Sequence, residues 1–201
     1  GDTDLLRELY DPLARYVRHW MDTFRTKWGL VIHPPGCSCL DDALRWHSGS
    51  PLSGRPGQPW HDQDWGKMSP TSFAAPDINA FLVLECRTLA AMARQLGKSD
   101  DATAWLAMAD ELAAAINQWL LEPETGTYQD RHIETGAFNG MVNLASFIPV
   151  YAGIAPPDIA EHLCRDYLLS PDHFLTDLPF PVIDRAHPTF RHGGFLHAPP
   201  S

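Results

Sequence analysis

The chain has 201 residues and a net charge of −10, and its 15 basic side chains are scattered along it. This length is enough for a single domain with a buried core, whereas a nucleic-acid-binding surface needs clustered Lys and Arg. No apolar run reaches the ~18 residues of a membrane span, so we expect neither nucleic acid nor membrane as a partner. A neutral ligand is compatible with this composition.

The first segment of the chain predicts a helix followed by a long loop. Asp11 and Pro12 resemble an N-cap followed by a first-turn proline. Apolar residues at helical spacing then predict a helix over 12–28, preceded by a shorter helical piece. Segment 29–75 holds many of the prolines, glycines and histidines. Long irregular segments of this kind inside compact domains are usually functional or disordered.

Two long helices are expected next. Asp77 follows Pro76 and can cap a helix over 77–97, for which Gly97 is a natural stop. Its apolar residues go nearly all the way round, which predicts burial on most sides. The helix expected over 100–121 has a single apolar stripe, so one of its faces should meet water.

The rest of the chain alternates in the same way. A turn at 122–126 and a short extended piece at 127–132 lead into the apolar segment 138–153, which continues the pattern of a buried helix. A short amphipathic helix over 156–169 and a loop-like tail follow. Alternating buried and half-buried helices favour two layers, so we expect an all-α, single-domain chain (1–201) built as part of a toroid of helical hairpins. A helical solenoid would give a similar pattern, but no fixed-period repeat is found.

Chemistry-bearing residues gather in the segment 40–46. Asp41 and Asp42, with Arg45 and Trp46, place two carboxylates, a guanidinium and an indole within seven residues. A sugar site needs an acid for the glycosidic oxygen, a fork of donors for hydroxyls and a flat apolar wall for the ring. The alternative is that the two acids only start a helix and that Arg45 is their structural partner.

Four further residues are candidates for sugar contacts. Trp60 and Trp65 lie in a polar loop, where they can stack on a sugar ring or pin the loop to the fold. Asp77 can be a helix cap, a sugar ligand or both. Asn79, in the first turn of the same helix, is the better candidate for a direct sugar contact.

Histidines and cysteines of the loop also invite a zinc interpretation. The candidate ligands are His33, Cys37, Cys39, His47 and His61. Their spacing fits no usual zinc site, so we expect no metal and no cofactor. Cys86 and Cys164 lie in apolar helical patterns and are expected to be buried thiols, which favours a reducing, cytoplasmic setting.

Four motifs in order resemble one enzyme group. The segment 40–46 (LDDALRW) is similar to W-D-x-S-x-R-W, and 77–81 (DINAF) to D-L-N-x-F. The segment 126–132 (GTYQDRH) is similar to G-x-Y-x-D-x-D, and 147–155 (FIPVYAGIA) to F-x-P-L-x-A-G-I-A. Together they resemble the trehalase and glycoside hydrolase family 63 group, which includes bacterial mannosylglycerate and glucosylglycerate hydrolases, over most of residues 10–190.

The resemblance implies an (α/α)6 barrel, of which this chain covers a part, and an inverting hydrolysis of a small α-linked glucoside or mannoside without a metal. Asp41 takes the general-acid position. A second carboxylate, about 6.5–9.5 Å away, would activate water from the far side of the sugar ring. The implied substrate-binding residues are Asp42, Arg45, Trp46, Trp60, Trp65, Asp77, Asn79, Tyr128 and Asp130.

The chain also departs from the group's pattern. Leu40 replaces a tryptophan, Ala43 a small hydroxyl residue and His132 the second aspartate of its motif. The tail 193–201 lacks a Trp-Arg-Gly stretch, and no glutamate after residue 165 can be the general base. Two alternatives to an enzyme therefore stay open: a carbohydrate-binding or relic half-barrel, and a helical interaction scaffold. An open half-ring should self-associate or be completed by a second chain.

Overall fold

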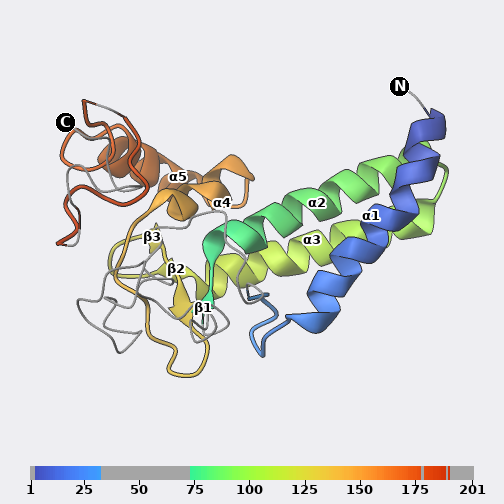
Figure 1. Ribbon diagram of the computed structural model, residues 1–201, viewed down its shortest axis with the longest axis horizontal. Coiled ribbons are helices and arrows are strands. Elements are labelled where there is room, and N and C mark those ends of the chain that lie inside the picture. Colours follow the sequence, from blue (N-terminus) through green and yellow to red (C-terminus); the bar gives the residue numbers. More distant parts are fainter. Residues whose placement is uncertain (1–2, 33–72, 178, 189, 191–201) are drawn as a thin grey trace, which may run out of the picture.

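Three long helices form one half of the molecule. The computed structural model describes residues 3–32, 73–177, 179–188 and 190. Helix α1 spans Thr3–Thr23, α2 spans Pro76–Gln95 and α3 spans Ser99–Trp119. Helices α2 and α3 run side by side as an antiparallel hairpin, and α1 lies across them at the end remote from the strands (Figure 1).

Helix α1 begins earlier and ends earlier than its sequence predicts. The expected N-cap at Asp11 is wrong, because Pro12 lies inside one continuous helix and both residues are exposed. Proline removes one backbone hydrogen bond, and the carbonyl that loses its partner at this exposed position can bond to water. The expected end at residue 28 is also wrong. Arg25 pairs with Val31 around a turn at Gly29, whose φ of 79° favours glycine.

The α2–α3 hairpin agrees closely with its prediction. The backbone N–H of Lys98 donates to the Ala93 carbonyl at 2.8 Å, and Gly97 has a φ of 74°, so this glycine ends α2 as expected. Helix α3 buries one stripe only, as its amphipathic pattern predicts. The stripe comprises Ala102, Trp105, Ala109, Leu112 and Ile116.

Tyr10 joins α1 to α3. Its side chain is 2% exposed, its hydroxyl donates to Asp101 at 2.9 Å, and the indole N–H of Trp105 donates to that hydroxyl at 3.0 Å. The Arg18 guanidinium lies 4.9 Å from the centre of the Trp105 ring on the same interface. A buried hydroxyl that is both donor and acceptor satisfies its hydrogen-bonding capacity within the core.

Among the described residues, four two-residue strands and the short helices make up the other half. Strand β2 (Leu121–Glu122) pairs with β3 (Thr127–Tyr128), which confirms the predicted turn at 122–126. Strand β1 (Phe73–Ala74) pairs antiparallel with β4 (Arg131–His132). The second pair joins residues far apart in the sequence.

The segment 138–153 does not form the long buried helix that its apolar residues suggest. It contains the 3₁₀ helix η4 (Leu144–Phe147) and the single turn α4 (Ile148–Tyr151). A capping box between Asn143 and Ser146 starts η4, and Gly140 has a φ of 72°. These local signals limit helical structure to residues 144–151 of the segment.

The expected C-terminal helix is present and changes type midway. It consists of α5 (Pro157–His162) followed by the π-helix η5 (Leu163–Leu168). The following segment is loop-like, as predicted. It is fixed by Phe174, whose ring meets Phe147 edge to face at 5.0 Å between centroids.

The cysteine predictions hold for one of the two residues described. Cys86 is fully buried, and its pKa is raised to about 11, first by burial and then by the charge of Glu85. Cys164 is half-buried. In the part of the chain that the structure describes, no helix combines the length and apolarity needed to cross a bilayer.

Candidate functional site

A short ladder of paired backbone segments gathers at the N-terminal end of α2. Ile32 pairs with Ala74, Ala74 with Arg131, and Arg131 with Phe138. The residues that flank the undescribed segment 33–72 are thus held together on this ladder. We name its edge, formed by Ile32, Phe73–Asp77 and Asp130–His132, the mouth.

Asn79 locks the mouth to α2. Its amide nitrogen donates to the carbonyls of Val31 at 3.0 Å and Ala75 at 2.8 Å, and its amide oxygen accepts from the Val31 N–H at 2.8 Å. The side chain is fully buried. Both amide protons are therefore committed to the backbone, which gives Asn79 the role of a clamp and leaves no N–H for a sugar.

Asp77 lies in the first turn of α2 and is 2% exposed. The expectation that it caps the helix is wrong, because Ala75 occupies the N-cap position and Pro76 the first helical one. A carboxylate within the first turn is still favoured, since the backbone N–H groups of a helix N-terminus carry partial positive charge. The sequence thus places a buried carboxyl group at the mouth.

Asp130 brings a second carboxylate to the same edge and is 1% exposed. It immediately precedes β4. Because β1 and β4 are antiparallel and Ala74 pairs with Arg131, Asp130 lies beside Ala75. The amide of Asn139 donates to its carboxylate at 3.3 Å, and the Asn139 N–H to its carbonyl at 3.0 Å. Asp77 and Asp130 therefore belong to two segments, about 50 residues apart in the sequence, that the β1–β4 pairing brings together.

Tyr128 belongs to the core and not to the mouth surface. It is fully buried, and its hydroxyl donates to the side-chain oxygen of Asn117 on α3. Burial raises the pKa of its phenol, and the charge of Asp158 raises it further, so the group stays protonated. The residue fixes the strands against α3, and a sugar cannot reach it.

Two residues that the sequence did not single out hold the mouth together. The Gln129 amide donates to Thr127 at 2.9 Å and accepts from the Gly140 N–H at 3.0 Å, which ties β3 to the next loop. The Arg131 guanidinium lies over the stacked rings of Trp28 and Trp119, 5.2 and 5.5 Å from their centres. No periodic signal marks either residue.

His132 stands where the resembled motif has an aspartate, and its ring accepts backbone hydrogen bonds. Its Nδ1 accepts from the backbone N–H groups of Glu134 and Thr135, each at 3.3 Å. Its ring meets Phe73 edge to face at 5.2 Å between centroids. Asp and Asn side chains can also close a turn in this way.

The other predicted site residues lie outside the described part of the chain. They are the proposed general acid Asp41 and the predicted sugar contacts Asp42, Arg45, Trp46, Trp60 and Trp65. The candidate zinc ligands of the loop lie there too. What the described residues add is the position of the two anchors of that segment, Ile32 and Phe73, at the mouth.

Solved structures of similar fold come from several carbohydrate-related proteins. A conserved protein of uncharacterized function from Thermus thermophilus matches with a TM-score of 0.73 and 22% identity, over 98% of this chain and 54% of that chain. The GH63 mannosylglycerate hydrolase from the same organism, in complex with glucose, matches with a TM-score of 0.71 and 22% identity, over 97% and 52%. A sialidase matches with a TM-score of 0.75 and 18% identity, over 95% and 16%.

These matches establish the fold as part of an α/α toroid, and the chain spans about half the length of the two Thermus proteins, 54% and 52%. The family model of the mannosylglycerate hydrolase MGH1-like glycoside hydrolase domain matches residues 1–195, nearly the whole sequence. The chain is therefore a glycoside hydrolase domain and belongs to the MGH1-like family.

Proposed function

We propose that the mouth is the sugar site of an inverting glycoside hydrolase domain for a small α-linked glucoside or mannoside, with Asp41 as the proton donor. One observation carries the proposal. The pairing of Ile32 with Ala74 holds both ends of the acid-bearing segment 33–72 beside the buried carboxylates Asp77 and Asp130.

In the proposed reaction Asp41 donates its proton to the glycosidic oxygen as the bond to the anomeric carbon breaks. A second carboxylate takes a proton from water, and the water oxygen forms the new bond from the opposite face of the ring. Arg45 and Asp42 would bind hydroxyls, and Trp46, Trp60 and Trp65 would supply the flat apolar wall.

The described carboxylates have a supporting part in this proposal. Asp77 and Asp130 are 2% and 1% exposed, so we assign them the role of orienting neighbouring groups. A negative charge close to Asp41 raises the pKa of a carboxyl group, and a general acid must still hold its proton near neutral pH.

Replacing Asp41 tests the assignment. We expect Asp41→Asn to abolish release of the sugar from mannosylglycerate and glucosylglycerate, with an unchanged free energy of unfolding in urea. Asp64→Asn, which removes a carboxylate of the same segment, is the matched control and should keep its turnover. Turnover that survives Asp41→Asn, or that both variants lose equally, would remove Asp41 from the role of acid.

The alternative function is sugar binding without hydrolysis. The sequence favours it in one respect, since Leu40 and His132 replace a tryptophan and an aspartate of the group's motifs. Calorimetric binding of mannosylglycerate with no turnover in the unsubstituted chain would select this alternative. Absence of both binding and turnover would leave the interaction scaffold.

Two further parts of the proposal concern the setting of the domain. We propose a cytoplasmic location, supported by the free thiols of Cys86 and Cys164 in the described residues. We also propose that a further helical segment, from a second chain or a second copy, adds to this half of the toroid.

A further inference from the structure

His162 joins the α5–η5 helix to the turn between β2 and β3 through both of its ring nitrogens. Its Nδ1 lies 2.8 Å from a carboxylate oxygen of Asp166, one turn later on the same helix. Its Nε2 lies 2.9 Å from the backbone carbonyl oxygen of Thr125, which belongs to the turn and precedes His162 by 37 residues. We name these three residues, His162, Asp166 and Thr125, the latch.

Both partners of the His162 ring can only accept hydrogen bonds. A carbonyl oxygen carries no proton. Hydrogen bonds from Arg165 and then from His162 hold the pKa of Asp166 well below its usual range, so that Asp166 is a carboxylate. A neutral imidazole has a single N–H donor, whereas the imidazolium has two. The latch is therefore complete only when His162 is protonated on both nitrogens.

Gly126 makes room for the His162 ring at the turn. It follows Thr125 and has a φ of 66°, which favours glycine. A Cβ at this position would lie 3.1 Å from Cδ2 and 3.4 Å from Nε2 of His162. An alanine would thus press on the edge of the ring that bonds to Thr125. The sequence supplies a glycine where the ring comes closest to the turn.

His173, in the next loop, makes a different kind of pair. In the part of the chain that the structure describes, its hydrogen bonds use Nδ1 alone, which lies 2.8 and 3.0 Å from the two carboxylate oxygens of Asp184. A neutral ring with its proton on Nδ1 can make this pair. The Tyr167 ring contacts both histidines, at centroid distances of 5.4 Å to His162 and 4.8 Å to His173. The two histidines thus share one region, and His162 differs in having two acceptors.

We propose that the latch is a pH-sensitive connection that holds the β2–β3 turn on the α5–η5 helix. It is formed when His162 carries two ring protons. In the neutral ring, one nitrogen would present a lone pair to an acceptor oxygen less than 3 Å away, so one of the two bonds is lost. The turn is therefore held in mild acid and released at about pH 8, where an ordinary histidine is neutral.

The other charged and titratable side chains around the latch belong to three elements. Carboxylates, guanidinium groups and phenols ordinarily titrate outside the range of about pH 6–8, so the histidines dominate the change within it. These neighbours are Asp158, Glu161, Arg165 and Tyr167 on the helix, Glu122 and Glu124 at the turn, and His173 and Asp184 in the next loop.

The latch lies at the start of a series of hydrogen bonds that leads toward the mouth. The hydroxyl oxygens of Thr125 and Thr127 are 2.8 Å apart, and the Gln129 amide donates to Thr127 at 2.9 Å. Gln129 is followed by Asp130 of the mouth. Release of the latch should therefore loosen the turn and β3 while the long helices stay folded. The inference concerns the turn and does not require a sugar at the mouth.

The test measures ring protonation and local opening in the whole chain. Long-range ¹H–¹⁵N NMR spectra show whether one or both ring nitrogens of His162 carry protons. Hydrogen exchange reports on the backbone N–H groups of Gly126 and Gln129, which donate to carbonyls at 2.9 Å. We expect a doubly protonated ring at about pH 6. Protection of these two amides, corrected for the intrinsic exchange rate, should fall by about fivefold between about pH 6 and 8.

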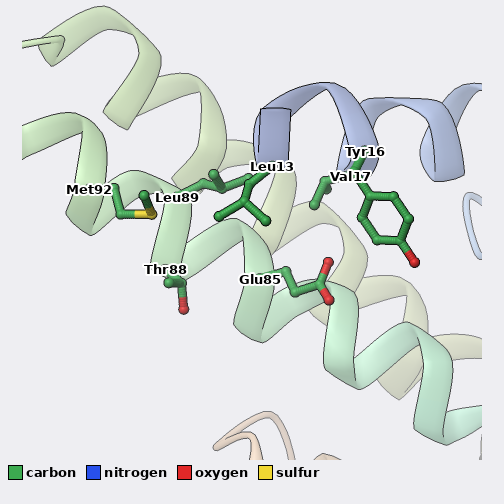
Figure 2. A pocket seen from close by; sticks show the side chains of 7 residues that line it. All are labelled: Leu13, Tyr16, Val17, Glu85, Thr88, Leu89 and Met92. Carbon is green, nitrogen blue, oxygen red and sulfur yellow. The ribbon is translucent and has the colours of Figure 1, made fainter. Parts of the chain in front are cut away.

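The α1–α2 pair is the internal reference for hydrogen exchange. Leu13 and Val17 of α1 face Leu89 of α2 around a groove, and these residues are not part of the latch (Figure 2). The amides of both helices should keep their protection at the two pH values. A parallel loss of protection in these helices would identify global unfolding as the cause and would contradict a local release.

Two matched pairs of variants make the result specific. His162→Gln should abolish the pH dependence of protection in the turn, and His173→Gln, which removes the other histidine paired with an aspartate, should preserve it. Gly126→Ala and Gly153→Ala add the same methyl group at φ values of 66° and 63°, but among the described residues nothing lies within 4 Å of a Cβ at Gly153. We expect only Gly126→Ala to lower the protection of the turn in mild acid.

Three results would overturn the inference. The first is a His162 ring with one protonated nitrogen at about pH 6. The second is a turn in the unsubstituted chain with the same protection at both pH values. The third is an equal effect of His162→Gln and His173→Gln on the turn. Because none of these measurements uses a sugar, failure of the proposed hydrolysis would leave them all unchanged.

Discussion

At the scale of single residues, Asn79 lies in a motif that we expected to bind a sugar, and its side chain bonds to the backbone. Its sequence position, in the first turn of a helix after an acidic residue, favours a ligand contact. Its partners are instead the backbone of Val31, 48 residues earlier, and of Ala75. A pairing across so long a segment leaves no local signature, so the sequence could indicate that Asn79 matters but not what it binds.

Replacing Asn79 should therefore destabilise the fold. Asn79→Ala leaves the N–H and the carbonyl of Val31 without their side-chain partner in a fully buried place, and we expect a loss of about 3 kcal/mol in the free energy of unfolding. Urea denaturation measures it, with the exposed Gln118→Ala on α3 as the control. A loss as small as that of the control would show that the clamp contributes nothing to stability.

Cys86 permits a prediction about pH. Its pKa is raised from 9.0 to about 11, chiefly by burial, so the folded state retains a proton that the unfolded chain loses between these values. Stability should accordingly fall as the pH rises above about 9, with a contribution of about 2 kcal/mol from this thiol by pH 11. Unfolding measured from pH 8 to 11 should show a shallower decline for Cys86→Ala than for the unsubstituted chain. Parallel declines would contradict the prediction.

At the scale of elements, the predictions succeed where the signal is local. The α2–α3 hairpin follows from apolar periodicity and from Gly97, and both its helices end within two residues of the expected positions. The ladder at the mouth could not be predicted, since each of its segments is too short to have a period. Segment 138–153 fails for a related reason: its apolar content is uniform, and Asn143 and Gly140 decide where the helix begins.

Pro12 gives the element scale a direct test. It lies inside α1 on the exposed side, where proline removes a hydrogen bond and strains the preceding turn. We expect Pro12→Ala to raise the free energy of unfolding by about 1–3 kcal/mol. Pro76→Ala, at the first position of α2 where proline is favourable, should give no gain. A loss of stability in Pro12→Ala would instead support a helix that starts at residue 12.

At the scale of the whole molecule, the order of four weak motifs predicted the toroid better than the helix count did. Each motif fixes a local structure, but their order along the chain is a property of one fold. Asp77 and Asp130, expected from separate motifs, are both buried, and the pairing of β1 with β4 brings their two segments together. The resemblance alone could not distinguish these two aspartates from Asn79 and Tyr128, whose side chains hold the fold together. All four residues lie in the same two motifs, 77–81 and 126–132.

Sugar binding should be visible as stability of the whole chain. A ligand that binds only the folded state adds about 2.7 kcal/mol to the free energy of unfolding at a hundred times its Kd. We expect mannosylglycerate to produce a saturable rise in the melting temperature of both the unsubstituted chain and Asp41→Asn, since the amide removes the proton donor and keeps the pocket. Trp46→Ala, which removes the proposed wall for the ring, should require a higher concentration of the sugar for the same rise.

The control for this measurement is sorbitol at equal concentration, because excluded polyols stabilise any folded protein without saturating. If mannosylglycerate and sorbitol raise the melting temperature equally, the effect is solvent exclusion and no sugar site exists on this chain. If the rise saturates in the unsubstituted chain and is absent in Asp41→Asn, then Asp41 holds the ground-state sugar. The turnover measurement would then be the sole test of Asp41 as a proton donor.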